Sequence, residues 1–116
     1  MANRIWGNGN NNPVTGNWLT GANWTGNTVP GALDTAIFDS DYSDENCTRS
    51  GTTANFVHSI EMRANYTGLL TLASTVDMEL DGSLTIRNGS LLIEGANLLA
   101  SNIYIGSPGG LATQVN

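Results

Sequence analysis

Three carboxylates stand at alternate positions along one short segment, Asp77, Glu79 and Asp81. Successive side chains of a β-strand point to opposite faces, so these three would line one outward face, about 6–7 Å apart. That distance suits glycoside hydrolysis, which needs two carboxyls about 5–9 Å apart and burial that raises the pKa of one. Nothing apolar surrounds this face and the chain has no lysine to serve as a base. We therefore predict a solvated face rather than a catalytic pair.

A second acidic group lies in the run Asp39–Glu45, where four carboxylates fall within seven residues. Asp39, Asp41, Asp44 and Glu45 are weak candidates for Ca²⁺ ligands. An EF-hand-like loop that began at Asp39 would need Gly at its sixth position and Glu at its twelfth, but Asp44 and Ser50 stand there. We interpret the run as a solvated acidic loop and expect no metal site.

His58 and Cys47 each occur once. His58 precedes Ser59, and strand neighbours point to opposite faces, so a Ser/His/Asp site is not expected. One His and one Cys cannot supply a zinc site, and Gly7-x-Gly9 lacks the helix that a nucleotide-binding loop needs. Cys47 is expected to be a small buried residue. The sequence thus predicts no cofactor and no enzymatic activity.

The composition limits the partners. The chain has 116 residues, a net charge of −6, four arginines and no lysine, which argues against binding to nucleic acid or to an anionic membrane. No apolar run reaches the 18 residues of a membrane helix. The N-terminus has no apolar signal segment, so we expect either a protein made without Sec export or one that lacks its leader.

The stretch from Ser59 to Gly106 contains an internal repeat of about 20 residues. Ile60-x-Met62 recurs as Leu84-x-Ile86 and Ile103-x-Ile105, at offsets of 24 and 19. Gly68–Leu72 resembles Gly89–Ile93, and Val76–Met78 resembles Asn97–Leu99, both at an offset of 21. Short alternating strands separated by single Gly or Asn residues favour an all-β fold, a short parallel β-solenoid. An antiparallel sandwich is the rival, because Asn88-Gly89 could form a hairpin turn. The residues from Ser107 to Asn116 are expected to leave the stack.

The N-terminal region concentrates all three tryptophans, Trp6, Trp18 and Trp24, among small residues. We expect a compact aromatic cap; the alternative is an exposed platform that binds sugars. Thr35–Phe38 is the first clear strand. One domain is predicted, with a cap and first strand at residues 1–38, an acidic and polar loop with a strand at 39–58, and solenoid coils at 59–116.

The order of motifs along the chain resembles the opening of a known family. The motifs are Trp6, Asn17-Trp18, Asn23-Trp24, Val29-Pro30 and Asp34–Phe38, followed by Tyr66–Leu72 and Leu84–Gly89. The family is that of autotransporter-type and phage surface proteins with a right-handed parallel β-helix. The resemblance implies a right-handed β-solenoid with an N-terminal Trp-rich cap, in an adhesin, a passenger domain or a virion surface protein. The chain holds about two and a half coils, which favours a small assembly protein.

We therefore expect a non-enzymatic structural protein, most of all a phage capsid decoration or cement subunit on the virion surface. Its partners would be coat protein or copies of itself in a homo-oligomer. The residues expected to form the cap and the assembly contacts are Trp6, Trp18, Trp24, Phe38, Ile103, Tyr104 and Ile105. One alternative is an adhesin or carbohydrate-binding module at the cell surface, with glycans as partners. A polysaccharide lyase or hydrolase fragment is the third reading.

Overall fold

The computed structural model describes residues 2–7, 16–51, 55–73, 75, 77–95, 97–106 and 113–115. Within these ranges the regular secondary structure is mostly β-strand, with two single-turn 3-10 helices, η1 (Gly21–Asn23) and η2 (Thr25–Asn27). The strands are β1 (Asn3–Ile5), β2 (Thr35–Phe38), β3 (Cys47–Arg49), β4 (Asn55–Val57), β5 (Ser59–Met62), β6 (Leu69–Leu72), β7 (Met78–Ile86), β8 (Gly89–Ile93), β9 (Leu98–Ile105) and β10 (Thr113–Val115). The all-β prediction is confirmed.

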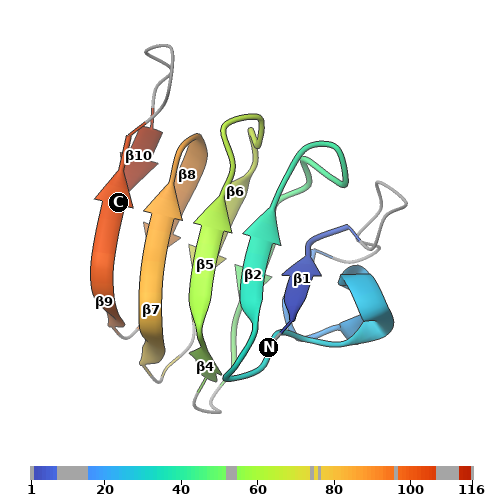
Figure 1. Cartoon of the computed structure of the whole chain (residues 1–116), viewed down its shortest axis with the longest axis horizontal. Coiled ribbons are helices and arrows are strands. Elements are labelled where there is room, and N and C mark those ends of the chain that lie inside the picture. The colour runs from blue at the N-terminus through green and yellow to red at the C-terminus, as the bar shows by residue number, and fades with distance from the viewer. Residues whose placement is uncertain are drawn as a thin grey trace.

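Two parallel sheets form the molecule. One has six strands, with β1, β2, β5, β7 and β9 side by side and β4 also paired to β7; the other has the order β3-β6-β8-β10. Figure 1 shows β1, β2, β5, β7 and β9 running in the same direction in the front layer, with β6, β8 and β10 behind them. From β5 onward the chain alternates between the two sheets at every strand. Every pairing between named strands in the described residues is parallel, which excludes the antiparallel sandwich.

Strand register confirms most of the repeat that the sequence predicted. Ile60 pairs with Leu84 and Leu84 with Ile103, while Leu70 pairs with Leu91. Each of these offsets equals the one read from the sequence. One alignment was wrong by a residue, because Met78 pairs with Leu98, at an offset of 20. Leu98 and Leu99 are both apolar, so the pattern alone could not separate the two registers. Val76, which belongs to the same alignment, lies outside the described residues.

Gly82 accounts for a second difference from prediction. The sequence suggested two strands with a break at Gly82, but β7 is continuous from Met78 to Ile86. Its register against β9 shifts between Leu80 and Ser83, as in a β-bulge. A Cβ on Gly82 would lie 2.8 Å from the carbonyl oxygen of His58, so only glycine lets the two backbones approach this closely.

The C-terminal residues differ from prediction too. We expected the chain to leave the stack after Gly106, but Thr113–Val115 forms β10 and pairs in parallel with Gly89–Leu91 of β8. The short Thr-Gln-Val segment was too weak a pattern to be recognised as a strand. The remaining tail residues, 107–112 and 116, lie outside the described residues, as do residues 8–15, which include Gly9.

The core lies between the two sheets and continues into the aromatic N-terminal region. Its centre is formed by inward residues of successive strands that stack in register, such as Ile60 on Leu84 and Met62 on Ile86. Phe38 and Tyr66 connect this aliphatic part to the tryptophans, with their ring centroids 5.3 Å apart. Cys47 is fully buried, as predicted.

Candidate functional site

The tryptophans close the N-terminal end of the core. Trp6, Trp18 and Trp24 are all fully buried. Trp24 packs edge-on against both of the others, with centroid distances of 5.1 Å to Trp6 and 4.9 Å to Trp18. Its Nε1–H donates to the carbonyl oxygen of Trp18 at 2.7 Å. The expected aromatic cluster is therefore present, and the alternative of an exposed sugar-binding Trp platform is wrong, because the packing leaves no indole face in contact with solvent.

The backbone at this end is also satisfied. The amide of Ile5 in β1 donates to Oγ1 of Thr25 at 2.9 Å, on the side away from β2. The next residue, Trp6, bridges Trp24 in antiparallel fashion. The η1–η2 segment lies against β1 at the right of Figure 1. This sheet edge is thus covered by the chain itself.

The opposite edge, along β9, is open. Among the described residues no strand pairs with β9 on the side away from β7. Ile103 and Ile105 each leave 54% of their surface exposed, although their register partners Leu84 and Ile86 are buried. They face the core but have no further layer to pack against. Tyr104, on the outer face, is 57% exposed.

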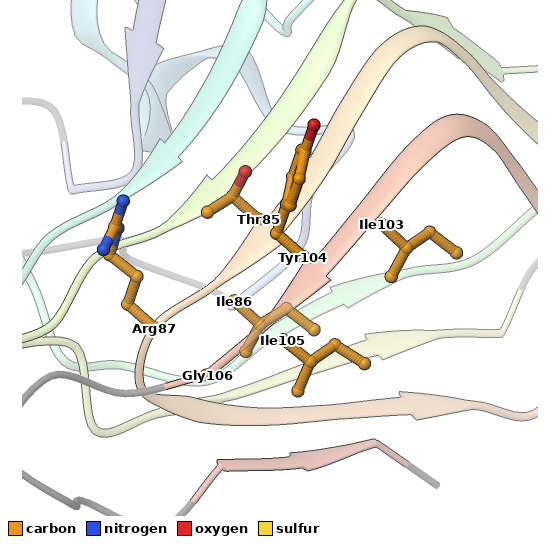
Figure 2. A pocket seen from close by; sticks show the side chains of 7 residues that line it. All are labelled: Thr85, Ile86, Arg87, Ile103, Tyr104, Ile105 and Gly106. Carbon is orange, nitrogen blue, oxygen red and sulfur yellow. The ribbon is translucent and has the colours of Figure 1, made fainter.

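A shallow hollow accompanies this edge. It is lined by Thr85, Ile86, Arg87, Ile103, Tyr104, Ile105 and Gly106. Figure 2 shows Tyr104 and Thr85 projecting together to one side of the strands and Ile86 and Ile105 to the other. The predicted assembly residues Ile103, Tyr104 and Ile105 therefore meet at this edge, whereas Trp6, Trp18, Trp24 and Phe38 lie in the closed aromatic end.

Sequence reasoning missed a polar pair on the neighbouring outer surface. Nδ1 of His58 lies 2.6 Å from Oδ1 of Asp81, and both side chains are substantially exposed. Oγ of Ser59 accepts the amide of Ser83 at 3.0 Å. The separation of 23 residues between His58 and Asp81, close to the repeat length, was the only available signal. The serine hydroxyl oxygen thus bridges two strands, which is a structural role.

The acidic run does not converge on a metal position. Asp39 accepts hydrogen bonds from Nη1 of Arg63 and Nδ2 of Asn65, each at 2.8 Å. Asp44 accepts the amide of Thr67 at 3.0 Å. No three potential ligands gather anywhere in the part of the chain that the structure describes. The four weak Ca²⁺ candidates are therefore not brought together: Asp39, Asp41, Asp44 and Glu45. Asp39 and Asp44 instead accept hydrogen bonds from residues of the following repeat.

The three alternating carboxylates on β7 and beside it also have separate surroundings. Asp77, Glu79 and Asp81 are exposed. Asp77 accepts the amide of Asn97 at 3.0 Å, and Asp81 pairs with His58. Glu79 instead lines a hollow near Phe56 and Ala32. The three carboxylates are exposed, as a solvated face requires, but the expectation that nothing apolar surrounds them is wrong at Glu79, whose hollow is also lined by Val57 and Leu80.

No family model, curated protein or solved structure matches this chain. The likeness to autotransporter-type and phage surface proteins thus remains a prediction from the residues quoted above. The described residues include no helix with the length and apolar character that crossing a membrane would require.

Proposed function

We propose that this chain is a non-enzymatic structural protein that assembles with other protein subunits as a short right-handed parallel β-solenoid. The alternation of strands between two parallel sheets supports the solenoid. So does the register, which brings residues 19–24 positions apart onto adjacent strands, as in Ile60, Leu84 and Ile103.

The observation that carries the assembly role is the contrast between the two ends. The N-terminal end buries three tryptophans and covers the edge of β1, whereas the C-terminal edge presents an uncharged strand with Ile103, Tyr104 and Ile105 more than half exposed. An open strand edge with apolar side chains favours pairing with another chain, because its outward backbone groups are available for hydrogen bonds. The edge of β9 is the proposed contact surface, and a coat protein or a second copy is the proposed partner.

The non-enzymatic role is supported by the positions of the carboxylates. Four aspartates accept hydrogen bonds from backbone amides. Asp34 accepts those of Ala2 and Gly31, and Asp39 accepts that of Asp41. Asp44 accepts the amide of Thr67, and Asp77 that of Asn97. The bonds from Gly31 and Asp41 close local turns, and the other three join segments at least 20 residues apart in the sequence. Carboxylates that serve as turn and loop acceptors are structural elements of the fold.

The proposed setting is the virion surface, where the chain would act as a decoration or cement subunit. An antiserum against the purified chain tests this setting on density-banded virions, cell-surface fractions and culture medium from the source. Signal on intact virions that persists through banding is expected. Signal confined to the cell surface or medium would overturn the virion assignment in favour of an adhesin.

One observation favours glycan binding as a second candidate. Tyr104 is exposed next to Arg87 and Thr85 in the same hollow, an arrangement that could stack on a sugar ring and bond its hydroxyls. A glycan array probed with the wild-type chain and with Tyr104→Ala tests it. Binding that the substitution abolishes would support this candidate, and an array without signal would remove it.

A further inference from the structure

We infer that β9 pairs with β9 of a second copy, antiparallel, about a two-fold axis that passes between Ser101 and Asn102. The inference rests on the proposed assembly role and names the partner of that edge. It follows from three features of the strand: its open edge, its lack of charge and the order of its apolar residues.

The edge of β9 lacks the charged residues and prolines that usually prevent a sheet edge from pairing with another chain. Its eight residues include no charged residue and no proline. Such edges usually carry lysine, proline or a bulge of their own, which prevent pairing. The register shift in this region places the extra residue in β7, because Leu80 to Ser83 oppose Ala100 to Asn102. β9 itself thus carries no extra residue, although its alternation breaks once at Ser101 and Asn102, because the inward residues Ala100 and Ile103 are three positions apart.

The apolar pattern of β9 is symmetric about its midpoint. Four residues face the core, as their partners in β7 show: Leu98, Ala100, Ile103 and Ile105. Leu99 and Tyr104 face outward, 45% and 57% exposed. Read in reverse, the strand repeats the same order of inward and outward positions.

This symmetry makes the strand complementary to itself. In an antiparallel pair centred between Ser101 and Asn102, Leu98 lies opposite the second copy's Ile105, and Ala100 opposite its Ile103. Leu99 lies opposite Tyr104 of the second copy on the outer face. Inward side chains meet inward ones, so that the exposed isoleucines would be covered by the second copy. Cross-strand apolar and aromatic pairs of this type stabilise a sheet.

A head-to-tail arrangement is disfavoured because the edge of β1 is already covered. The outward amide of Ile5 is bonded to Thr25, and Trp6 bridges Trp24. Apart from β1 and β9, the strand of this sheet with a single partner in the described residues is β4, and its three residues offer β9 only a short edge. Two chains of net charge −6 repel each other, and contact through an uncharged strand keeps that repulsion low. A closed two-fold dimer satisfies both conditions.

Disulfide trapping tests the register directly. Leu99→Cys and Tyr104→Cys are purified separately, mixed in equal amounts under oxidising conditions and analysed on a non-reducing gel. The mixture is expected to form a covalent dimer, because opposed residues have Cβ atoms about 4.5–5.5 Å apart. Each variant alone is expected to stay uncrosslinked, because identical positions would be separated by about 17 Å along the strand.

The matched control is Leu33→Cys, which alters an exposed leucine in a turn that lies outside the strand β9. Mixed with Tyr104→Cys it is expected to give no dimer. Equal crosslinking with this control, or none in the Leu99→Cys and Tyr104→Cys mixture, would overturn the inference.

Sedimentation of the wild-type chain gives an independent measurement. A dimer is expected, and Leu99→Glu, at an exposed position, is expected to weaken dimerisation about tenfold or more while the circular dichroism spectrum is unchanged. A monomeric chain that is still found on virions would reject self-pairing and leave the proposed function intact. A crosslinked dimer absent from virions would reject the virion setting alone.

Discussion

Arg63 reaches back 24 residues to Asp39, with its Nη1 2.8 Å from the Oδ2 atom of the carboxylate. The same guanidinium places Nε 3.3 Å from Glu61. Asn65 and the amide of Asp41 complete the shell around Asp39, at 2.8 and 2.9 Å. This network ties the loop after β2 to the loop after β5, one repeat later along the chain.

Replacing Asp39 with Asn should destabilise the protein by about 2 kcal/mol at pH 7, since charge-assisted hydrogen bonds to a buried carboxylate are lost. Burial acts to raise the pKa of Asp39, but the hydrogen bonds from Arg63, Asp41 and Asn65 outweigh it and lower the pKa below its usual 3.8. The contribution is therefore present above pH 3.8 and is lost as pH falls through the lowered value.

Urea unfolding of wild type and Asp39→Asn at neutral pH and in steps below pH 4 measures this difference. The difference in the free energy of unfolding between wild type and Asp39→Asn should become smaller in acid. Glu94→Gln, at an exposed carboxylate, serves as the control and should show little change at either pH. A gap that stays constant down to pH 2 would contradict the assigned role of the Asp39 charge.

Gly82→Ala should lower stability by about 1–3 kcal/mol, because the added methyl group meets the carbonyl oxygen of His58 and the hydroxyl of Ser59. The backbone there cannot move away easily, since the Gly82 amide donates to the same His58 oxygen at 2.8 Å. The control is Gly106→Ala, where nothing lies within 4 Å of the added atom. Thermal melts of the two variants should differ clearly, and equal melting temperatures would refute the close approach.

Trp24→Phe should lower the free energy of unfolding by about 2–4 kcal/mol, since it leaves a cavity and removes the hydrogen bond from the indole Nε1–H to the Trp18 carbonyl oxygen. Tyr104→Phe is the matched aromatic control at an exposed position. In the wild type, acrylamide should quench tryptophan emission poorly because all three indoles are buried. Efficient quenching of the native protein would contradict the closed aromatic end.

Cys47 should not react with thiol reagents in the native protein at pH 8. Burial raises the pKa of its thiol well above the usual value, so the reactive thiolate is scarce and the sulfur is inaccessible. One thiol per chain should become reactive in denaturant, as a colorimetric thiol assay would record. Fast native labelling would place Cys47 outside the core and would require its removal before the trapping experiment.

The amino-acid pattern alone was sufficient for the all-β class and most of the strand register. Inward residues such as Ile60, Leu84 and Ile103 must recur once per repeat because each strand buries its apolar face on the next. Residue type, rather than period, predicted Thr35–Phe38 as a strand, from its β-branched and aromatic residues, and Cys47 as a small buried residue. Residue type, alternation and period are all local properties, which survive in a linear sequence.

Other features depended on the packed chain. The burial of Trp18 and Trp24, the bulge opposite Ala100 and the pairing of β10 with β8 require neighbours distant in sequence. Whether Asp39 meets Arg63, or His58 meets Asp81, is set by how each loop turns between sheets, and composition does not encode that geometry. The open edge of β9 is likewise a tertiary property, because Ile105 and Ile86 hold equivalent positions in the repeat, but only Ile86 has a further described strand packed on it.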